Sequence, residues 1–351
     1  MKPFVYNALP ARVIFGSNTL IQVSDEVKLL GGQRALVLST PNQKEAADQV
    51  AKLLGDLSVG CFYGAAMHTP IDVTHEALNV VAETKADCII AIGGGSTIGL
   101  AKAIALNTDL PQIVIPTTYA GSEATPIIGQ TENGLKTTQR TLKVLPEVII
   151  YDVELTKTLP SQMTITSALN AIAHAIEALY SKDANPLISM LAEQGISALA
   201  RAIPVIHRDP FNSNARSDAL FGAWACGTCL GAVGMSIHHK LCHTLGGSFN
   251  LPHAETHTVI LPHAVAYNED AAPQAMTCIA RALGTDNAAQ GLFDLASKHG
   301  APTTLKEIGL SAADIERAVE IACASPYWNP RPIEANAIRE LLTNAFNGVR
   351  P

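Results

Sequence analysis

Histidines are concentrated in one short stretch of the second half of the chain. His238, His239, His243 and His253 fall within sixteen residues, and His243 follows His239 at the i, i+4 spacing of one helix face. Histidine titrates near neutral pH, so such a cluster suits proton transfer or hydrogen bonding to a developing negative charge. Histidines that only occupy polar positions between helices are the alternative. We favour an active site, because four such residues lie so close together.

A glycine-rich turn marks a second candidate site in the first half. Gly93-Gly94-Gly95-Ser96-Thr97 directly follows the apolar run 88–92 and precedes a segment typical of a helix start. Glycines let the backbone approach a ligand closely, and the amides at a helix N-terminus favour a pyrophosphate. The turn differs from the GxGxxG fingerprint, so a tight strand-to-helix connection is the alternative.

A second loop supports nucleotide binding at this place. The apolar run 112–115 is followed by Pro116-Thr117-Thr118-Tyr119, and then by Ala120-Gly121-Ser122-Glu123. Hydroxyl groups and small residues at neighbouring strand ends line the crevice in which α/β sheets bind ligands. The two loops together favour a nucleotide site over a simple turn.

The elements that carry these groups divide the chain into two parts. Residues 1–157 alternate short apolar runs with amphipathic stretches, which predicts an α/β domain with a mostly parallel sheet. Strands are predicted at 35–39, 88–92, 112–115 and 148–151, and a helix at 43–54. Residues 158–351 contain long apolar segments without strand signals, which predicts an all-helical domain. Its helical segments are predicted at 161–181, 184–206, 213–243 and 272–299.

Composition limits the partners and the compartment. Hydrophobic residues make up 48% of the chain, and the formal net charge is −7. A negative chain without basic runs is not expected to bind nucleic acid or a membrane surface. The seven cysteines lack disulfide spacing, and no run is long enough to span a bilayer, so we expect a cytoplasmic protein. Cys226 and Cys229 form a CxxC for which we favour helix packing over a redox role.

Taken together, these motifs identify a family resemblance that covers essentially the whole chain. GGGS at 93–96, PTTYAGSE at 116–123 and the histidine cluster together resemble the iron-containing alcohol dehydrogenase family. The resemblance is narrower to its maleylacetate reductase branch, through MHTP at 67–70, GGGSTIGLAK at 93–102, IPTTYAGSEATP at 115–126, HHKLCHTLGG at 238–247 and YWNPRP at 327–332. It implies a dehydroquinate synthase-like fold, with an α/β dinucleotide-binding domain before an all-α domain, and a homodimer.

The family's metal positions carry an altered donor set in this chain. The metal-binding relatives use one Asp and three His, and the resemblance places these positions at Asn170, His174, His239 and His253. A neutral amide in place of the carboxylate weakens binding of a divalent cation. Lys240 next to His239 would repel a dication and attract a carboxylate, unless it points to solvent. We therefore expect no catalytic metal.

The branch implies reduction of the carbon–carbon double bond of maleylacetate to 3-oxoadipate, with NADH or NADPH, during degradation of aromatic compounds such as resorcinol. Within that reaction we predict His243 as the proton donor. His174, His239 and His253 would orient the substrate or stabilise an enolate, and Lys240 is a candidate anchor for a substrate carboxylate in the catalytic set. The predicted contacts to a small dicarboxylate substrate are Tyr119, Asn170, Thr244 and Arg331.

The cofactor contacts are predicted in the first domain. Thr40 follows the strand 35–39 where NAD-selective relatives carry an Asp, so we expect both NADH and NADPH to be used. Lys136 aligns with a cofactor-contacting lysine of relatives, or is a surface charge. The full predicted set is Thr40, Gly93, Gly94, Gly95, Ser96, Thr117, Thr118, Ser122 and Lys136.

Two other functions compete with this prediction. A metal-dependent alcohol dehydrogenase could bind iron or zinc through three histidines and tolerate Asn170. A nicotinamide-binding scaffold or oligomerisation module without catalytic activity is the second rival, and the intact histidine cluster disfavours it.

Overall fold

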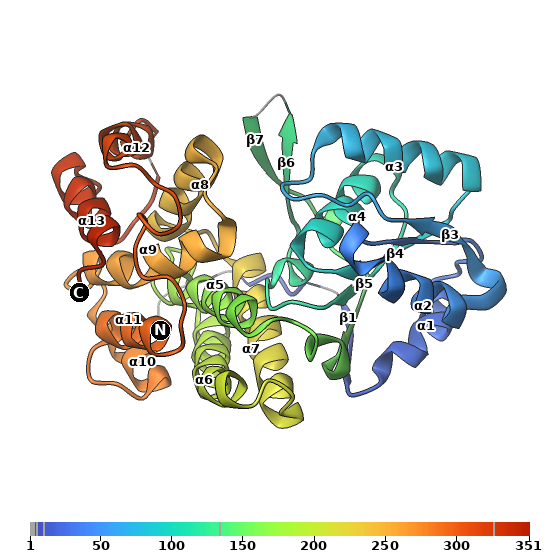
Figure 1. Cartoon of the computed structure of the whole chain (residues 1–351), viewed down its shortest axis with the longest axis horizontal. Coiled ribbons are helices and arrows are strands. Elements are labelled where there is room, and N and C mark those ends of the chain that lie inside the picture. The colour runs from blue at the N-terminus through green and yellow to red at the C-terminus, as the bar shows by residue number, and fades with distance from the viewer. Residues whose placement is uncertain (1–3, 5, 10, 133–134, 326) are drawn as a thin grey trace. The chain divides into compact units, whose positions relative to one another are not determined.

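The computed structural model describes residues 4, 6–9, 11–132, 135–325 and 327–351, with the side chains of 135 and 136 left out. It divides into two compact units (Figure 1), one spanning Ala8–Leu159 and the other Pro160–Pro351. The division lies two residues after the predicted boundary. Phe4, Tyr6 and Asn7 group with the second unit, whereas the sequence had assigned them to the first.

The first unit contains a six-stranded parallel sheet in the order β1-β8-β5-β4-β2-β3. Its strands are β1 Arg12–Gly16, β2 Ala35–Leu38, β3 Ser58–Phe62, β4 Cys88–Gly93, β5 Gln112–Pro116 and β8 Val148–Asp152. Its α-helices are α1 Val23–Leu29, α2 Lys44–Leu54, α3 Ile71–Thr84 and α4 Gly95–Thr108. The central strands are buried on both faces, as their continuous apolar runs predict.

The two faces of the sheet are covered by different helices. Val27 of α1 and Val50 of α2 share one apolar core with alternate strand residues such as Ile90 and Ile113. Helix α4 packs against β4 and β5. This arrangement brings the carboxyl ends of β2, β4 and β5 side by side at one edge, and the predicted cofactor loops begin there.

A two-stranded antiparallel hairpin lies outside the main sheet. It pairs β6 Ile127–Glu132 with β7 Leu135–Arg140. It was not predicted, because its Thr- and Gln-rich strands lack a strong apolar alternation. Lys136 belongs to β7, but its side chain lies outside the described part of the structure.

The described residues of the second unit form helices and connecting loops, with no strand among them. Its α-helices are α5 Ser161–Leu179, α6 Pro186–Arg208, α7 Ser213–Ala232, α8 Ile237–Phe249, α9 His253–Tyr267, α10 Pro273–Leu283, α11 Ala288–Lys298, α12 Ile315–Cys323 and α13 Ala335–Asn347. Two predicted segments are each split in the structure. Segment 272–299 breaks after Gly284, which adopts a left-handed conformation, and segment 213–243 breaks at 233–236, where Val233 and Ser236 leave helical geometry.

The paired cysteines of the CxxC lie inside α7. Cys226 and Cys229 are fully buried free thiols, and a Cβ placed on Gly195 of α6 would lie 2.7 Å from Cys226 Sγ. This close approach of two helices agrees with the packing interpretation of the pair.

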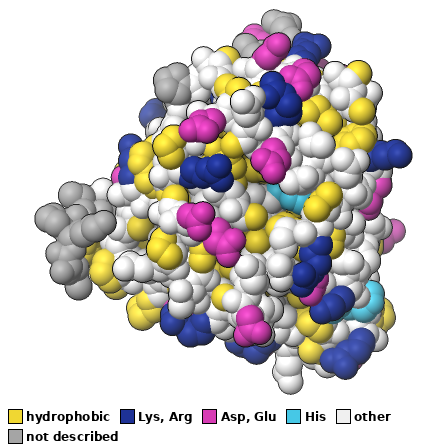
Figure 2. Space-filling model, turned by 90° about the vertical axis from the view of Figure 1, so that its left-hand side faces the viewer, with side chains coloured by type: hydrophobic (Ala, Val, Ile, Leu, Met, Phe, Trp, Pro, Cys, Tyr) yellow, Lys and Arg dark blue, Asp and Glu magenta, His cyan; other side chains and the backbone are white. Residues whose placement is uncertain are grey.

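Charges of both signs are mixed on the surface that Figure 2 shows, where Lys and Arg lie among Asp and Glu. Among the described helices, none alone has the length and apolar composition to cross a bilayer; α7 and α8 meet those criteria only as a pair bent by 96°.

Candidate active site

The glycine turn has a geometry that only glycine accommodates at its first two positions. Gly93 has φ +152°, and a Cβ there would lie 2.5 Å from Thr97 Oγ1 and 2.7 Å from Gln43 Oε1. A Cβ on Gly94 would lie 2.9 Å from the methyl group of Thr118. A Cβ on Gly95 would meet nothing within 4 Å. The first turn of α4 is therefore open at Gly95, where helix amides and the helix dipole favour an anion.

A hydrogen-bonded bridge crosses this turn. Gln43 Nε2 donates to Thr117 Oγ1 at 2.8 Å, and Thr117 N donates to Gly93 O at 3.0 Å. Thr40 Oγ1 lies 3.4 Å from Gln43 Oε1. The structure therefore brings the predicted residues Thr40, Gly93 and Thr117 together through Gln43. Gln43 was not predicted, because a glutamine after a strand gives no signal of its own.

The remaining predicted residues of the first unit surround the same edge. Ser96 lies in the first turn of α4, and Ser122 begins a short 3₁₀ turn, Ser122–Ala124. The Tyr119 side chain is fully buried, so its ring offers little surface to a substrate. Its predicted role as a carboxylate anchor thus gains no support from its burial.

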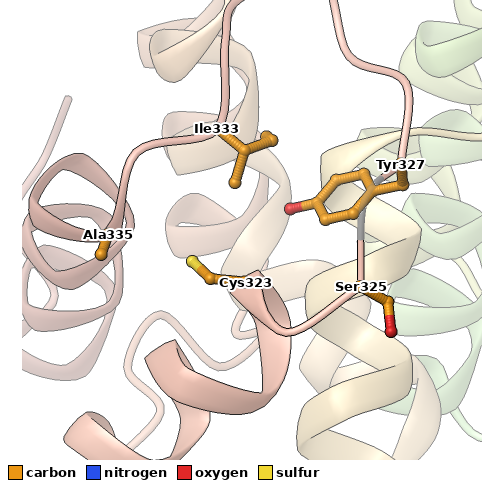
Figure 3. Close-up of a pocket in the computed structure, with 5 residues that line it drawn as sticks. All are labelled: Cys323, Ser325, Tyr327, Ile333 and Ala335. Atoms are coloured by element: carbon orange, nitrogen blue, oxygen red, sulfur yellow. The ribbon is translucent and has the colours of Figure 1, made fainter.

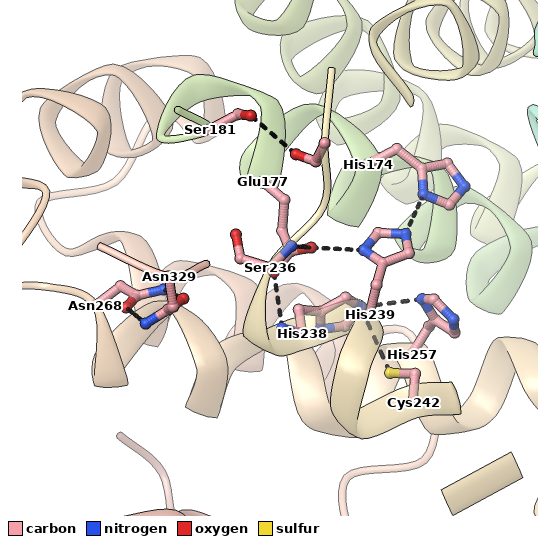
Figure 4. Close-up of polar contacts among 11 residues, drawn as sticks. His174, Glu177, Ser181, Ser236, His238, His239, Cys242, His257, Asn268 and Asn329 are labelled. Atoms are coloured by element: carbon pink, nitrogen blue, oxygen red, sulfur yellow. Dashed lines mark hydrogen bonds and ion pairs between the residues drawn. The ribbon is translucent and has the colours of Figure 1, made fainter. Parts of the chain in front are cut away.

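The predicted histidines of the second unit come from three helices. Asn170 and His174 share one face of α5, as their spacing predicts, and both are buried. His239 and His243 share a face of α8, with ring centroids 6.2 Å apart. His174 Nδ1 lies 2.8 Å from His239 Nε2 (Figure 4), so a hydrogen bond between these two rings joins α5 to α8.

A buried carboxylate organises this cluster. Glu177 Oε2 accepts from His239 Nδ1 at 2.7 Å and from Ser236 N at 2.8 Å, while Oε1 accepts from His238 N at 2.7 Å (Figure 4). It therefore satisfies amides that begin α8 and also orients the His239 ring. With Nδ1–H given to Glu177, His239 Nε2 is left to accept from His174. Glu177 was not among the predicted site residues.

A second buried pair of histidines lies beside the first. His238 Nε2 lies 3.0 Å from His257 Nδ1, and both side chains are fully buried. Burial, with a contribution from neighbouring histidines, lowers the pKa of His238 and of His257 well below the usual value, so both are neutral at pH 7. The His257 ring centroid is 4.4 Å from His253 and 5.1 Å from His239. His257 thus occupies the centre of the cluster, and the i, i+4 spacing from His253 was its only sequence signal.

Donor atoms of His238, Cys242 and His257 gather within 4.8 Å of one another, as those of a metal site can. Cys242 Sγ lies 3.7 Å from His238 Nε2. Burial, reinforced by Glu177, raises the pKa of the Cys242 thiol well above its usual value. A neutral thiol beside a hydrogen-bonded histidine pair is the state that these contacts favour.

Lys240 lies on a different face of α8 from His239, because consecutive helical residues are separated by 100°. Its Nζ lies 5.7 Å from the centroid of the Tyr327 ring, at the distance of a cation–π contact. Tyr327 in turn lines a hollow with Cys323, Ser325, Ile333 and Ala335 (Figure 3), which contains none of the predicted site residues. Thr244 is buried next to His243.

The structure does not bring Arg331 to the histidines. Its guanidinium lies 4.3 Å from the centroid of the Tyr267 ring and donates to Tyr267 O at 3.2 Å. Tyr267 ends α9, whereas His253 begins it, about 20 Å away along the helix axis. Arg331 instead lines another hollow with His263 and Asn344. The sequence predicted that Arg331 contacts the substrate. That prediction rested on the motif at 327–332, and a motif does not show where its loop lies in the fold.

Comparisons with known proteins match the whole chain. The family model described as iron-containing alcohol dehydrogenase matches residues 10–153, and that described as Fe-containing alcohol dehydrogenase family, C-terminal, matches residues 164–346. A maleylacetate reductase of Rhizobium sp. (strain MTP-10005) is 55% identical over 351 residues, which is 100% of both chains. The crystal structure of maleylacetate reductase from Agrobacterium tumefaciens is 57% identical, with a TM-score of 0.97 and 100% coverage of both chains. That of an iron-containing alcohol dehydrogenase from Corynebacterium glutamicum is 41% identical, with a TM-score of 0.95, over 99% of this chain and 98% of the other.

Proposed function

We propose that this chain, which belongs to the iron-containing alcohol dehydrogenase family and is an oxidoreductase, reduces the carbon–carbon double bond of maleylacetate to give 3-oxoadipate. NADH or NADPH supplies the hydride, and no metal takes part. The observation that carries the proposal is the donor set of the second unit. Asn170, a neutral amide, lies on the same face of α5 as His174, and His174 is hydrogen-bonded to His239.

The chemistry of maleylacetate suits a site that offers an amide and imidazole groups as hydrogen-bond donors. The double bond of maleylacetate is conjugated to a ketone, so a hydride added to the carbon β to the ketone leaves an enolate. The enolate oxygen then requires hydrogen-bond donors, and the carbon α to the ketone takes up one proton. One hydride and one proton account for the two hydrogens of the product.

Each residue of the cluster has a role in this scheme. Glu177 holds His239 so that the hydrogen bond between His239 and His174 keeps both rings in place. His243, one helical turn after His239, delivers the proton to carbon. Asn170 donates its amide hydrogens to a substrate carboxylate, which an aspartate at this position would repel.

The donor set fits a divalent metal poorly. The Asp of metal-binding relatives is replaced by Asn170, which removes the anionic ligand. Without a metal, His174 Nδ1 and His239 Nε2 can share a proton across their 2.8 Å separation. No step of the proposed reaction passes through a metal ion.

The first unit fits a nicotinamide cofactor. Gly93 and Gly94 leave no room for a side chain, and the open start of α4 at Gly95 offers backbone amides to a pyrophosphate. Thr40 follows β2 with a neutral side chain, so nothing at that position repels a 2′-phosphate. We expect kcat/KM values for NADH and NADPH within about tenfold of each other in matched kinetics. A much stronger preference for NADH would contradict this assignment.

The experiment is reduction of maleylacetate with NADH dideuterated at C4 of the nicotinamide. We expect one NADH oxidised per 3-oxoadipate formed, with deuterium on the carbon β to the ketone. Deuterium on a carbinol carbon would identify a ketone reductase of the alcohol dehydrogenase type instead. If maleylacetate is reduced neither at its double bond nor at its ketone and no NADH is oxidised, a non-catalytic nicotinamide-binding scaffold would be the remaining function.

A further inference from the structure

A lysine is completely buried in the helix that follows the glycine turn. Lys102 of α4 is 1% exposed, although lysine is one of the residues least often buried. Its Nζ donates to three backbone carbonyl oxygens, at 2.6 Å to Ser122, 2.7 Å to Thr125 and 2.9 Å to Ile127. It also lies 3.0 Å from Thr125 Oγ1. The three N–H groups of an ammonium match the three carbonyl acceptors.

A buried carboxyl group, that of Glu123, lies near the ammonium, and burial raises the pKa of this carboxyl. Glu123 is fully buried in the same loop, and its Oε1 accepts from Tyr151 OH at 3.0 Å. Burial lowers the pKa of Lys102 to about 7, and the charge of Glu123 acts in the opposite direction. A buried ammonium is unfavourable unless it is paired and hydrogen-bonded, so the contacts of Lys102 compensate a large desolvation penalty.

One acceptor, Ser122, belongs to the second predicted cofactor loop, and the other two follow directly after it. In the structure the connection runs from Thr117 to Ile127, where β6 begins, and Thr118 at its start lies against the glycine turn. Lys102 lies seven residues after Gly95, about two turns into the helix that the glycine turn starts. One side chain therefore joins the helix of the first loop to the backbone of the second.

We propose that Lys102 is a positioning residue for the cofactor, which holds the loop 117–127 against the glycine turn so that both can contact one dinucleotide. The inference rests on the proposed use of NADH or NADPH. Lys102 touches neither cofactor nor substrate in this role. It acts through the carbonyl groups of Ser122, Thr125 and Ile127.

The test is the Lys102→Met variant, which keeps an unbranched side chain one atom shorter and removes the charge and the donors. We measure the dissociation constant of NADH by fluorescence titration, which needs no substrate, and confirm folding by thermal denaturation. We expect NADH to bind about tenfold more weakly, while the KM for maleylacetate changes less than twofold. The control is Lys52→Met on the exposed side of α2, which should bind NADH as the wild type does.

The pH profile distinguishes this role from general destabilisation. Because the ammonium is present below pH 7 and lost above it, NADH affinity of the wild type should fall as pH rises through about 7. The groups that face Lys102 here are Glu123 and, through Glu123, Tyr151. Lys102→Met should lack this dependence.

If Lys102→Met does not fold, Thr125→Val removes one contact to the ammonium and the donation from Thr125 Oγ1 to Ser122 O. It should weaken NADH binding by a smaller factor, about threefold. Unchanged NADH binding in a folded Lys102→Met or Thr125→Val protein would overturn the inference. A wild-type protein that does not bind NADH would instead overturn the proposed function on which the inference rests.

Discussion

Glu177 and His239 are joined by a 2.7 Å hydrogen bond in which the imidazole Nδ1–H donates to a fully buried carboxylate. The same carboxylate accepts from the amides of Ser236 and His238 at the start of α8. One side chain of α5 therefore fixes both the position of α8 and the ring of its first site histidine. Stability and catalysis should both depend on this contact.

Replacement of Glu177 by Gln should affect both properties. The amide cannot accept all three hydrogen bonds without turning an N–H toward another donor, so we expect the free energy of unfolding to fall by about 2 kcal/mol. We also expect kcat to fall about tenfold, because His239 loses its fixed tautomer. Urea unfolding and steady-state kinetics measure the two effects. Glu193→Gln, which loses a largely exposed pair with Arg281, should cost less than about 1 kcal/mol.

The His243→Ala variant tests the proton donor. General acid catalysis by a positioned side chain contributes roughly a hundredfold or more, so kcat should fall by at least about a hundredfold. The dissociation constant of NADH should stay within about twofold of the wild-type value, because the predicted cofactor residues lie in the first unit. His75→Ala, at an exposed position of α3, is the matched control. Turnover at the wild-type level would remove His243 from this role.

The Asn170→Asp variant tests the electrostatic argument about the metal. A carboxylate next to His174 on α5 would restore an anionic ligand to a histidine set, so this variant should acquire Zn²⁺ or Fe²⁺ that the wild type does not retain. Metal content after dialysis against each cation measures the difference. Asn287→Asp, at the N-terminus of α11, should acquire none. Equal metal content in Asn170→Asp and the wild type would show that a carboxylate at position 170 does not determine whether this site binds Zn²⁺ or Fe²⁺.

Acid sensitivity should depend in part on His263. Burial lowers the pKa of His263 from 6.5 to about 4, so the unfolded chain binds a proton more tightly than the folded one. The stability that this group contributes is present above pH 6.5 and is lost as pH falls toward 4, up to about 3 kcal/mol. His263→Gln should therefore lose less unfolding free energy over this window, whereas the exposed His207→Gln should behave as the wild type. An equal loss of unfolding free energy between pH 6.5 and pH 4 in the wild type, His263→Gln and His207→Gln would contradict the lowered pKa of His263.

The periodic parts of the fold were predictable because their signals are local. The four apolar runs 35–39, 88–92, 112–115 and 148–151 all correspond to strands of the main sheet. Strands β1 and β3 were missed because they lie at the edges of the sheet and are only partly buried, and β3 carries a glycine in its middle.

The site was predictable only as far as residue types and spacing carry information. The spacing of Asn170 and His174 correctly predicted a shared helix face. The contacts of Glu177, Gln43 and Lys102 join segments that are distant in sequence. The residue numbers of the partners differ by 62 for Glu177 with His239, by 74 for Gln43 with Thr117 and by 20 for Lys102 with Ser122. Such pairings depend on how helices and strands pack, and no periodic pattern encodes them.

The measurement that tests the central claim most directly is the turnover of maleylacetate by protein whose metal content has been determined before and after treatment with a chelator. The account predicts full NADH-dependent activity at less than about one tenth of a metal ion per chain, and no change when the chelator is present. Activity that disappears on removal of a stoichiometric metal, and returns when iron or zinc is added back, would contradict it.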